Sequence, residues 1–210
     1  MILNAPLVLV YLRMLAAGPI VVLLAGPGTA GAAPAFAIFV VAALTDAVDG
    51  RLARHLGQVT RLGTFLDPLA DKILIVGTLI GLQAKGLVPA WIVVLIVARE
   101  LAVTNLRAIA AARGYSVGAS PYGKAKTIVQ SAATAGLLLL LAAPSAPLAD
   151  LAYSLLAAAV ALTVLSGADY LWKASYAIAG RGVPEPWRAE RSARAAQTAP
   201  KAPEAPGRAR

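Results

Sequence analysis

Four aspartates lie within one short stretch of a chain that is otherwise mostly apolar: Asp46, Asp49, Asp67 and Asp71. Asp46 and Asp49 are three residues apart, and Asp67 and Asp71 are four apart, so each pair would share one face of a helix. A charged side chain at bilayer depth costs about 3 kcal/mol or more, and neighbouring carboxylates also repel one another. One or two bound divalent cations would offset both costs, and oxygen-only ligands favour Mg²⁺ or Mn²⁺.

Two residues beside these aspartates suit a phosphate site. Gly50 lets a ligand or another backbone approach closely, and Arg54, one helical turn later, could hold a phosphate. Two alternatives to a catalytic metal site stay open. The aspartates could form purely stabilising ion pairs with Arg51, Arg54 and Arg61, or they could line the cation pathway of a transporter. A transporter usually places its charges near the bilayer midplane, whereas these lie at one end of the apolar stretches.

The composition indicates an all-α polytopic membrane protein. Of the 210 residues, 59% are hydrophobic and 14% are charged, whereas a soluble domain carries about 25% charged residues. The absence of cysteine excludes disulfides and thiolate metal sites, and the single histidine excludes zinc sites built on several histidines. The net charge of +9 is explained by the positive-inside rule and by anionic lipid headgroups, so we expect no nucleic-acid partner.

Six apolar stretches have roughly the 20 residues that a membrane-spanning helix needs; they cover residues 7–25, 33–53, 68–83, 89–111, 125–143 and 149–176. Basic residues gather after the second and fourth stretches and in the C-terminal segment, while the opposite loops hold almost none. This asymmetry predicts that both termini and the aspartates face the cytoplasm. We therefore expect a six-helix catalytic domain over residues 1–180 and a basic, Ala/Pro-rich disordered cytoplasmic tail over residues 181–210.

The segment from Asp46 to Asp71 resembles the signature of the CDP-alcohol phosphatidyltransferase family, D-x-x-D-G-x-x-A-R-x8-G-x-x-x-D-x-x-x-D, with no departures. The resemblance implies six transmembrane helices in a bacterial inner or plasma membrane, usually as a homodimer, with a cytoplasm-facing cavity open to lipid. It also implies that an alcohol displaces CMP from a CDP-linked lipid.

Carried over to this sequence, the resemblance implies a role for each residue of the segment. Asp46, Asp49 and Asp67 would hold one Mg²⁺ or Mn²⁺ ion. Asp46, Asp67 and Asp71 would hold a second ion, and Asp71 would also take the proton from the attacking hydroxyl. The two ions would neutralise the pyrophosphate and the charge that develops as CMP leaves. The CDP part of the lipid would contact Gly50, Arg54 and Thr60.

Further residues are similar to a bacterial branch of the family whose acceptor is glycerol 3-phosphate; they are Asn4-x-Pro6 with Arg13 and Pro19, Ala98-Arg99-Glu100 with Arg107, and Tyr122-Gly123-Lys124-x-Lys126-Thr127. Glycerol 3-phosphate is a dianion near neutral pH, so its site needs cations. The candidates are Arg99, Arg107, Lys124 and Lys126. Arg99 lies well inside an apolar run, where an arginine indicates function by default. The positive-inside rule alone could also account for these basic residues.

We therefore expect a membrane enzyme that transfers a phosphatidyl group from CDP-diacylglycerol to glycerol 3-phosphate and yields phosphatidylglycerol phosphate and CMP. The first alternative is the same chemistry with phosphatidylglycerol, inositol phosphate or serine as acceptor, because other branches of the family share some of these motifs. The alternative from a different class is a divalent-cation transporter or a catalytically silent membrane scaffold.

Overall fold

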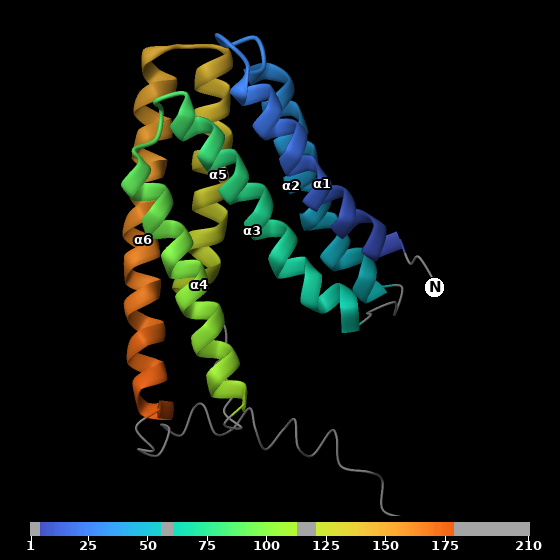
Figure 1. Ribbon diagram of the computed structural model, residues 1–210, viewed down its shortest axis with the longest axis vertical. Coiled ribbons are helices and arrows are strands. Elements are labelled where there is room, and N and C mark those ends of the chain that lie inside the picture. The colour runs from blue at the N-terminus through green and yellow to red at the C-terminus, as the bar shows by residue number, and fades with distance from the viewer. Residues whose placement is uncertain (1–4, 56–60, 113–120, 179–210) are drawn as a thin grey trace, which may run out of the picture.

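The computed structural model describes residues 5–55, 61–112 and 121–178, and these residues form six helices and no strand (Figure 1). The helices are α1 (Ala5–Ala25), α2 (Ala32–His55), α3 (Arg61–Ala84), α4 (Ala90–Ala112), α5 (Pro121–Ala142) and α6 (Ala146–Ile178). They run alternately up and down, so that α2 and α4 end, and α3 and α5 begin, at the lower end of the bundle in Figure 1. The predicted all-α class with six helices is confirmed for this part of the chain.

The third helix begins earlier than its apolar stretch predicts. α3 starts at Arg61, whereas hydropathy places the start at residue 68. The first two turns carry polar residues such as Thr64 and Asp67, which lower the hydropathy but do not break a helix. Pro68 therefore falls inside α3 rather than in its first turn.

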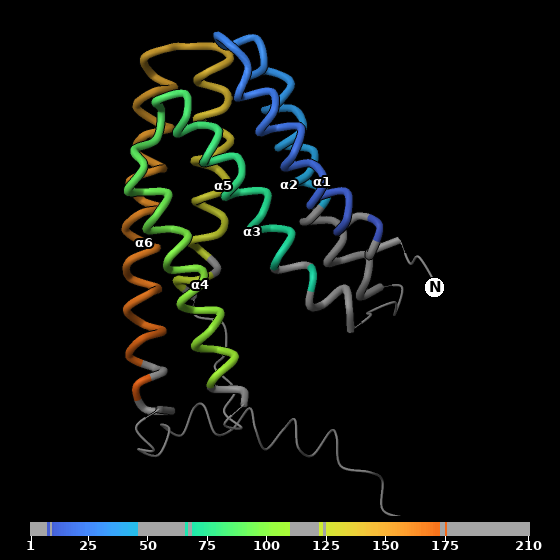
Figure 2. Tube along the Cα trace, viewed as in Figure 1, coloured from blue at the N-terminus to red at the C-terminus, as the bar shows by residue number. Residues whose placement is uncertain are grey.

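The bundle consists of two groups of three helices, α1–α3 and α4–α6, that meet at the upper end and separate toward the lower end (Figure 2). Within them, α1 packs against α2 and α3, while α6 packs against α4 and α5. Contacts of α5 with α2 and of α4 with α3 join the two groups. The shared core includes Phe39 of α2, Leu79 of α3 and Leu137 of α5, each almost fully buried.

The hydroxyl groups of three threonines inside this core form hydrogen bonds within their own helices. Thr78, Thr134 and Thr163 each donate a hydrogen bond to the carbonyl oxygen four residues earlier, at 2.8, 2.8 and 2.6 Å. Such bonds within a helix remove the cost of burying a hydroxyl. These buried polar residues therefore need no ligand.

Within the described residues, two helices carry an apolar run long enough to cross a membrane. The runs are Ala125–Ala142 in α5 and Ala146–Trp172 in α6, with mean hydropathies of 1.5 and 2.0. α1 and α2 carry shorter runs, Val10–Ala25 and Ala32–Thr45. Charged residues interrupt the apolar runs of α3 and α4, and several of them line the cavity described below.

Lys85 ties the end of α3 to the turn that follows α1. Its Nζ donates hydrogen bonds to the carbonyl oxygens of Gly26, at 2.5 Å, and of Gly28, at 2.7 Å. Gly28 has φ +64°, a conformation that glycine adopts without strain. The two bonds join segments that are far apart in the sequence at the upper end of the bundle.

We predict that Lys85→Met lowers the free energy of unfolding by about 1–3 kcal/mol, because the ammonium group's hydrogen bonds to two carbonyls are lost while the length of the side chain is kept. The measurement is the thermal unfolding midpoint of the protein in detergent. Gln83→Met, at an exposed position two residues earlier, is the control and should leave the midpoint unchanged. Equal midpoints for the two variants would contradict the role of Lys85.

Candidate functional site

A cavity of about 530 Å³ lies among α3, α4, α5 and α6. Its volume falls in the range of small-molecule sites. Among the described residues that line it, cations outnumber carboxylates by four to two. The charged and polar lining residues include Asp71, Lys72, Arg99, Glu100, Thr104, Arg107, Lys126, Gln130 and Tyr170.

The helical repeat explains why these residues meet. On α4, Arg99, Val103 and Arg107 follow one another at intervals of four, so they lie along one face. On α5, Lys126 and Gln130 are also four apart and face the same cavity. The site is therefore assembled from single faces of several helices rather than from a loop.

Glu100 connects cations from three helices. Its Oε1 accepts a hydrogen bond from Arg99 Nη1 at 2.9 Å and another from Lys126 Nζ, and its Oε2 lies 3.8 Å from Lys72 Nζ. The side chains of Glu100 and Lys126 are only 14% and 6% exposed. Lys72 also donates a hydrogen bond to Thr104 Oγ1 at 2.6 Å. A buried carboxylate with several cationic partners avoids the cost that an unpaired buried charge would carry.

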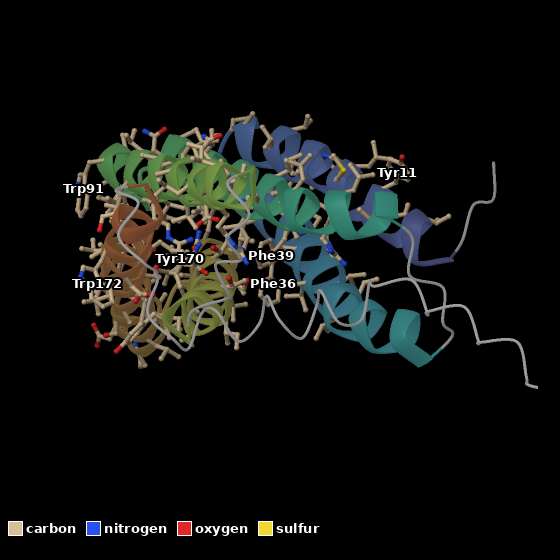
Figure 3. All side chains as sticks on the ribbon, turned by 90° about the horizontal axis from the view of Figure 1, so that it is seen from below. Tyr11, Phe36, Phe39, Trp91, Tyr170 and Trp172 are labelled. Carbon is tan, nitrogen blue, oxygen red and sulfur yellow. The ribbon has the colours of Figure 1, made fainter. Side chains whose placement is uncertain are left out.

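Tyr170 of α6 lies beside two of the arginines. The Cζ atoms of Arg99 and Arg107 are 5.5 and 5.8 Å from the centroid of its ring. Figure 3 shows Tyr170 pointing into the space among α4, α5 and α6, while Trp172 of the same helix points outward. Cation–π attraction at these distances holds both guanidinium groups over one ring.

Arg99 passes close to glycines of α5 and α6. A Cβ at Gly167 would lie 3.4 Å from Arg99 Cγ, and a Cβ at Gly123 would lie 4.0 Å from Arg99 Nη2. The long side chain of Arg99 therefore runs close to the backbones of both helices.

The predicted acceptor-site residues Arg99, Arg107 and Lys126 line one cavity together with Asp71, the predicted base. Lys124 lies in the first turn of α5, but its side chain is outside the described residues. Asp46 and Asp49 lie on α2, and Asp67 lies on α3 with Asp71. The side chains of Asp46, Asp49, Asp67 and Arg54 and the surroundings of Gly50 are outside the described residues, as is Thr60 entirely. The roles assigned to all of these residues stay predictions.

The sequence pattern does not single out Lys72, Gln130 or Tyr170, and it includes Glu100 only as part of the Ala98-Arg99-Glu100 motif. Lys72 and Gln130 do carry a signal, because one adjoins Asp71 and the other follows Lys126 by one turn within an apolar run. Tyr170 carries none, since an aromatic residue near the end of an apolar stretch fits a membrane interface equally well.

Comparison with known proteins shows what the chain is similar to. Residues 3–165 match the protein family described as CDP-alcohol phosphatidyltransferase. The chain is 46% identical over 155 residues to the "Probable phosphatidylglycerophosphate synthase" of Mycobacterium tuberculosis (strain H37Rv), covering 74% of this chain and 72% of that protein. It is 48% identical over 139 residues to the "CDP-diacylglycerol--glycerol-3-phosphate 3-phosphatidyltransferase" of Bacillus subtilis (strain 168), covering 65% and 70%.

We predict that Glu100→Gln destabilises the protein by about 3 kcal/mol, because it leaves three neighbouring cations without their shared carboxylate. Lys126→Met alone should also destabilise it. The double variant should lose less stability than the two single variants together, because each has already removed the same ion pair. Unfolding midpoints of the four proteins form the measurement, and strictly additive losses would show that Glu100 and Lys126 do not interact.

Proposed function

This chain belongs to the CDP-alcohol phosphatidyltransferase family, and we propose that it transfers a phosphatidyl group from CDP-diacylglycerol to glycerol 3-phosphate. The products are phosphatidylglycerol phosphate and CMP. One observation carries most of the weight: Asp71 shares a cavity with Arg99, Arg107 and Lys126. A relative whose name specifies CDP-diacylglycerol and glycerol 3-phosphate supports this choice of substrates.

The surplus of cations in the cavity favours a phosphate monoester as the acceptor. Near neutral pH such an ester is a dianion. The described lining residues include four cations and two carboxylates, a surplus of two positive charges. Guanidinium groups bind phosphate through paired donors. Serine, a zwitterion, and phosphatidylglycerol, a phosphodiester, bring less negative charge. The names of the relatives favour glycerol 3-phosphate over inositol phosphate.

In the proposed reaction, a hydroxyl oxygen of glycerol 3-phosphate attacks the phosphorus atom that bears the diacylglycerol. The bond from this phosphorus to the oxygen of CMP breaks, and CMP leaves with the bonding electrons. The hydroxyl proton passes to the carboxylate of Asp71. Arg99 and Arg107 hold the phosphate of the acceptor, so that its hydroxyl is presented to Asp71 in one orientation.

The four aspartates suit a pair of Mg²⁺ or Mn²⁺ ions, because carboxylates are the oxygen ligands that these cations prefer. The end of α2, with Asp46 and Asp49, and the beginning of α3, with Asp67 and Asp71, lie at the same end of the bundle (Figure 1). Asp46, Asp49 and Asp67 would hold one ion, and Asp46, Asp67 and Asp71 the other. Bound there, the ions would neutralise the pyrophosphate. The CDP part of the lipid would contact Gly50, Arg54 and Thr60.

The exposed surface supports a bundle that spans the membrane six times. Every helix exposes a large apolar side chain, a surface that water disfavours and hydrocarbon does not. Trp91, near the start of α4, and Trp172, near the end of α6, both lie on the outer face (Figure 3), as interfacial tryptophans do at the two membrane surfaces. The exposed apolar residues include Leu15, Val41, Ile80, Val94, Ile128 and Leu171.

We place this bundle in the bacterial inner or plasma membrane, with both termini and the cavity facing the cytoplasm. The basic residues at the lower end of the bundle support this orientation through the positive-inside rule. A homodimer, as the family resemblance implies, is part of the same proposal. The tail predicted over residues 181–210 lies outside the described residues.

We predict that purified protein, supplied with CDP-diacylglycerol and Mg²⁺ or Mn²⁺, releases CMP with glycerol 3-phosphate and not with phosphatidylglycerol, inositol phosphate or serine. Removal of divalent ions with EDTA should abolish the release, and their return should restore it. Quantification of CMP by chromatography is the measurement. Equal release with another alcohol would identify a different acceptor, and ion flux without CMP release would indicate a transporter.

Asp71→Asn should lower kcat by about 10²–10⁴-fold, because the amide cannot accept the hydroxyl proton. The unfolding midpoint is measured alongside kcat, to separate loss of chemistry from loss of fold. Asp150→Asn, at an exposed position near the start of α6, is the matched control and should keep full activity. A kcat for Asp71→Asn within twofold of the wild-type value would exclude Asp71 as the base.

A further inference from the structure

Two buried side chains of the cavity have polar atoms without a hydrogen-bond partner among the described residues. They are Arg99, at Nε and Nη2, and Gln130, at Oε1. Gln130 is only 3% exposed, and the side chain of Arg99 is 10% exposed. Buried polar atoms are nearly always hydrogen-bonded, and both residues line the same cavity. The pair therefore indicates a ligand that satisfies both.

Neighbouring polar residues differ from Gln130 in this respect. Thr104 accepts a hydrogen bond from Lys72, and Thr127 donates one to the carbonyl oxygen of Gly123 at 3.3 Å. The main-chain carbonyl of Gln130 is also occupied, since Thr134 donates to it at 2.8 Å. What is left for a ligand is the side-chain carbonyl of Gln130, one turn along α5 from Lys126.

The two side chains need opposite partners. A guanidinium group can only donate hydrogen bonds, and an amide oxygen can only accept them. The ligand must therefore present an acceptor to Arg99 and an O–H or N–H group to Gln130. The dianion of a phosphate monoester satisfies Arg99 but has no proton on its phosphate. The hydrogen bond to Gln130 Oε1 must then be donated by a hydroxyl group on the carbon skeleton of the ligand.

We propose that Gln130 determines acceptor specificity by accepting a hydrogen bond from a second hydroxyl of the acceptor, the one that does not attack phosphorus. This inference rests on the proposed function and deepens it. The attacking hydroxyl gives its proton to Asp71, so it cannot serve Gln130 as well. Gln130 would then favour glycerol 3-phosphate over phosphate monoesters that carry a single hydroxyl.

The test compares glycerol 3-phosphate with 3-hydroxypropyl phosphate, which keeps the phosphate and a primary hydroxyl but lacks the second hydroxyl. The wild-type protein should prefer glycerol 3-phosphate by about 10- to 100-fold in kcat/KM, because the analogue leaves Gln130 Oε1 buried without a partner. Gln130→Met keeps the length of the side chain and removes the amide, and its preference should fall to about twofold or less.

Two further variants complete the design. Gln130→Glu keeps an acceptor oxygen at the same place and should retain most of the preference, although its charge should raise KM for both phosphates. Gln83→Met makes the same replacement at an exposed position on α3 and should behave as the wild type. Since each preference is a ratio within one protein, a smaller folded fraction of a variant does not change it.

Two results would overturn the inference while leaving the proposed function intact. One is a wild-type preference near one, and the other is a wild-type preference that Gln130→Met retains. Absence of CMP release from the wild-type protein with glycerol 3-phosphate would instead overturn the proposed function, and the role of Gln130 with it.

Discussion

A carboxylate shared among three cations holds the site together. Glu100 binds Arg99 of its own helix, Lys126 of α5 and Lys72 of α3, so one buried acid joins three helices at the level of the cavity. Each of the three cations contacts this carboxylate, and the four groups together keep a net positive charge. An environment of low dielectric strengthens both the internal attraction and the attraction of the surplus for an anion. The cluster that joins the helices is therefore also the one that we propose binds the phosphate of the acceptor.

The surrounding helices separate this polar interior from an apolar exterior. The threonines of the core donate hydrogen bonds to carbonyl oxygens of their own helices, so their hydroxyl groups require no ligand. The apolar side chains either pack in the core or face outward. Several charged residues of α3 and α4 line one cavity; they are Asp71, Lys72, Arg99, Glu100 and Arg107. These residues interrupt the apolar runs of the two helices.

Much of this arrangement could be predicted from the sequence, because apolar runs of spanning length indicate helices and a charge inside such a run indicates function. Arg99 could be selected in this way, whereas Arg107 and Lys126 were selected through the family resemblance and because a phosphate dianion needs cations. The start of α3 could not, since hydropathy does not register the polar turns from Arg61 onward. Glu100 was harder to interpret, because adjacent residues on a helix point apart. The flexible side chain of Arg99 nevertheless reaches Glu100, and its Nη1 lies 2.9 Å from Glu100 Oε1.

The residues proposed to bind metal and CDP and those proposed to bind the acceptor alcohol are distributed differently along the sequence. The residues proposed to bind metal and CDP all lie in one stretch of sequence, from Asp46 to Asp71, so a fixed pattern of spacings captures them. The proposed acceptor site is spread over four helices as single residues, and Tyr170 lies beyond residues 3–165, the part that matches the family. No local spacing relates Lys72 to Gln130 or to Tyr170, because helix packing alone brings them to one cavity. A signature can therefore specify the reaction, while the alcohol that enters it is specified by tertiary structure.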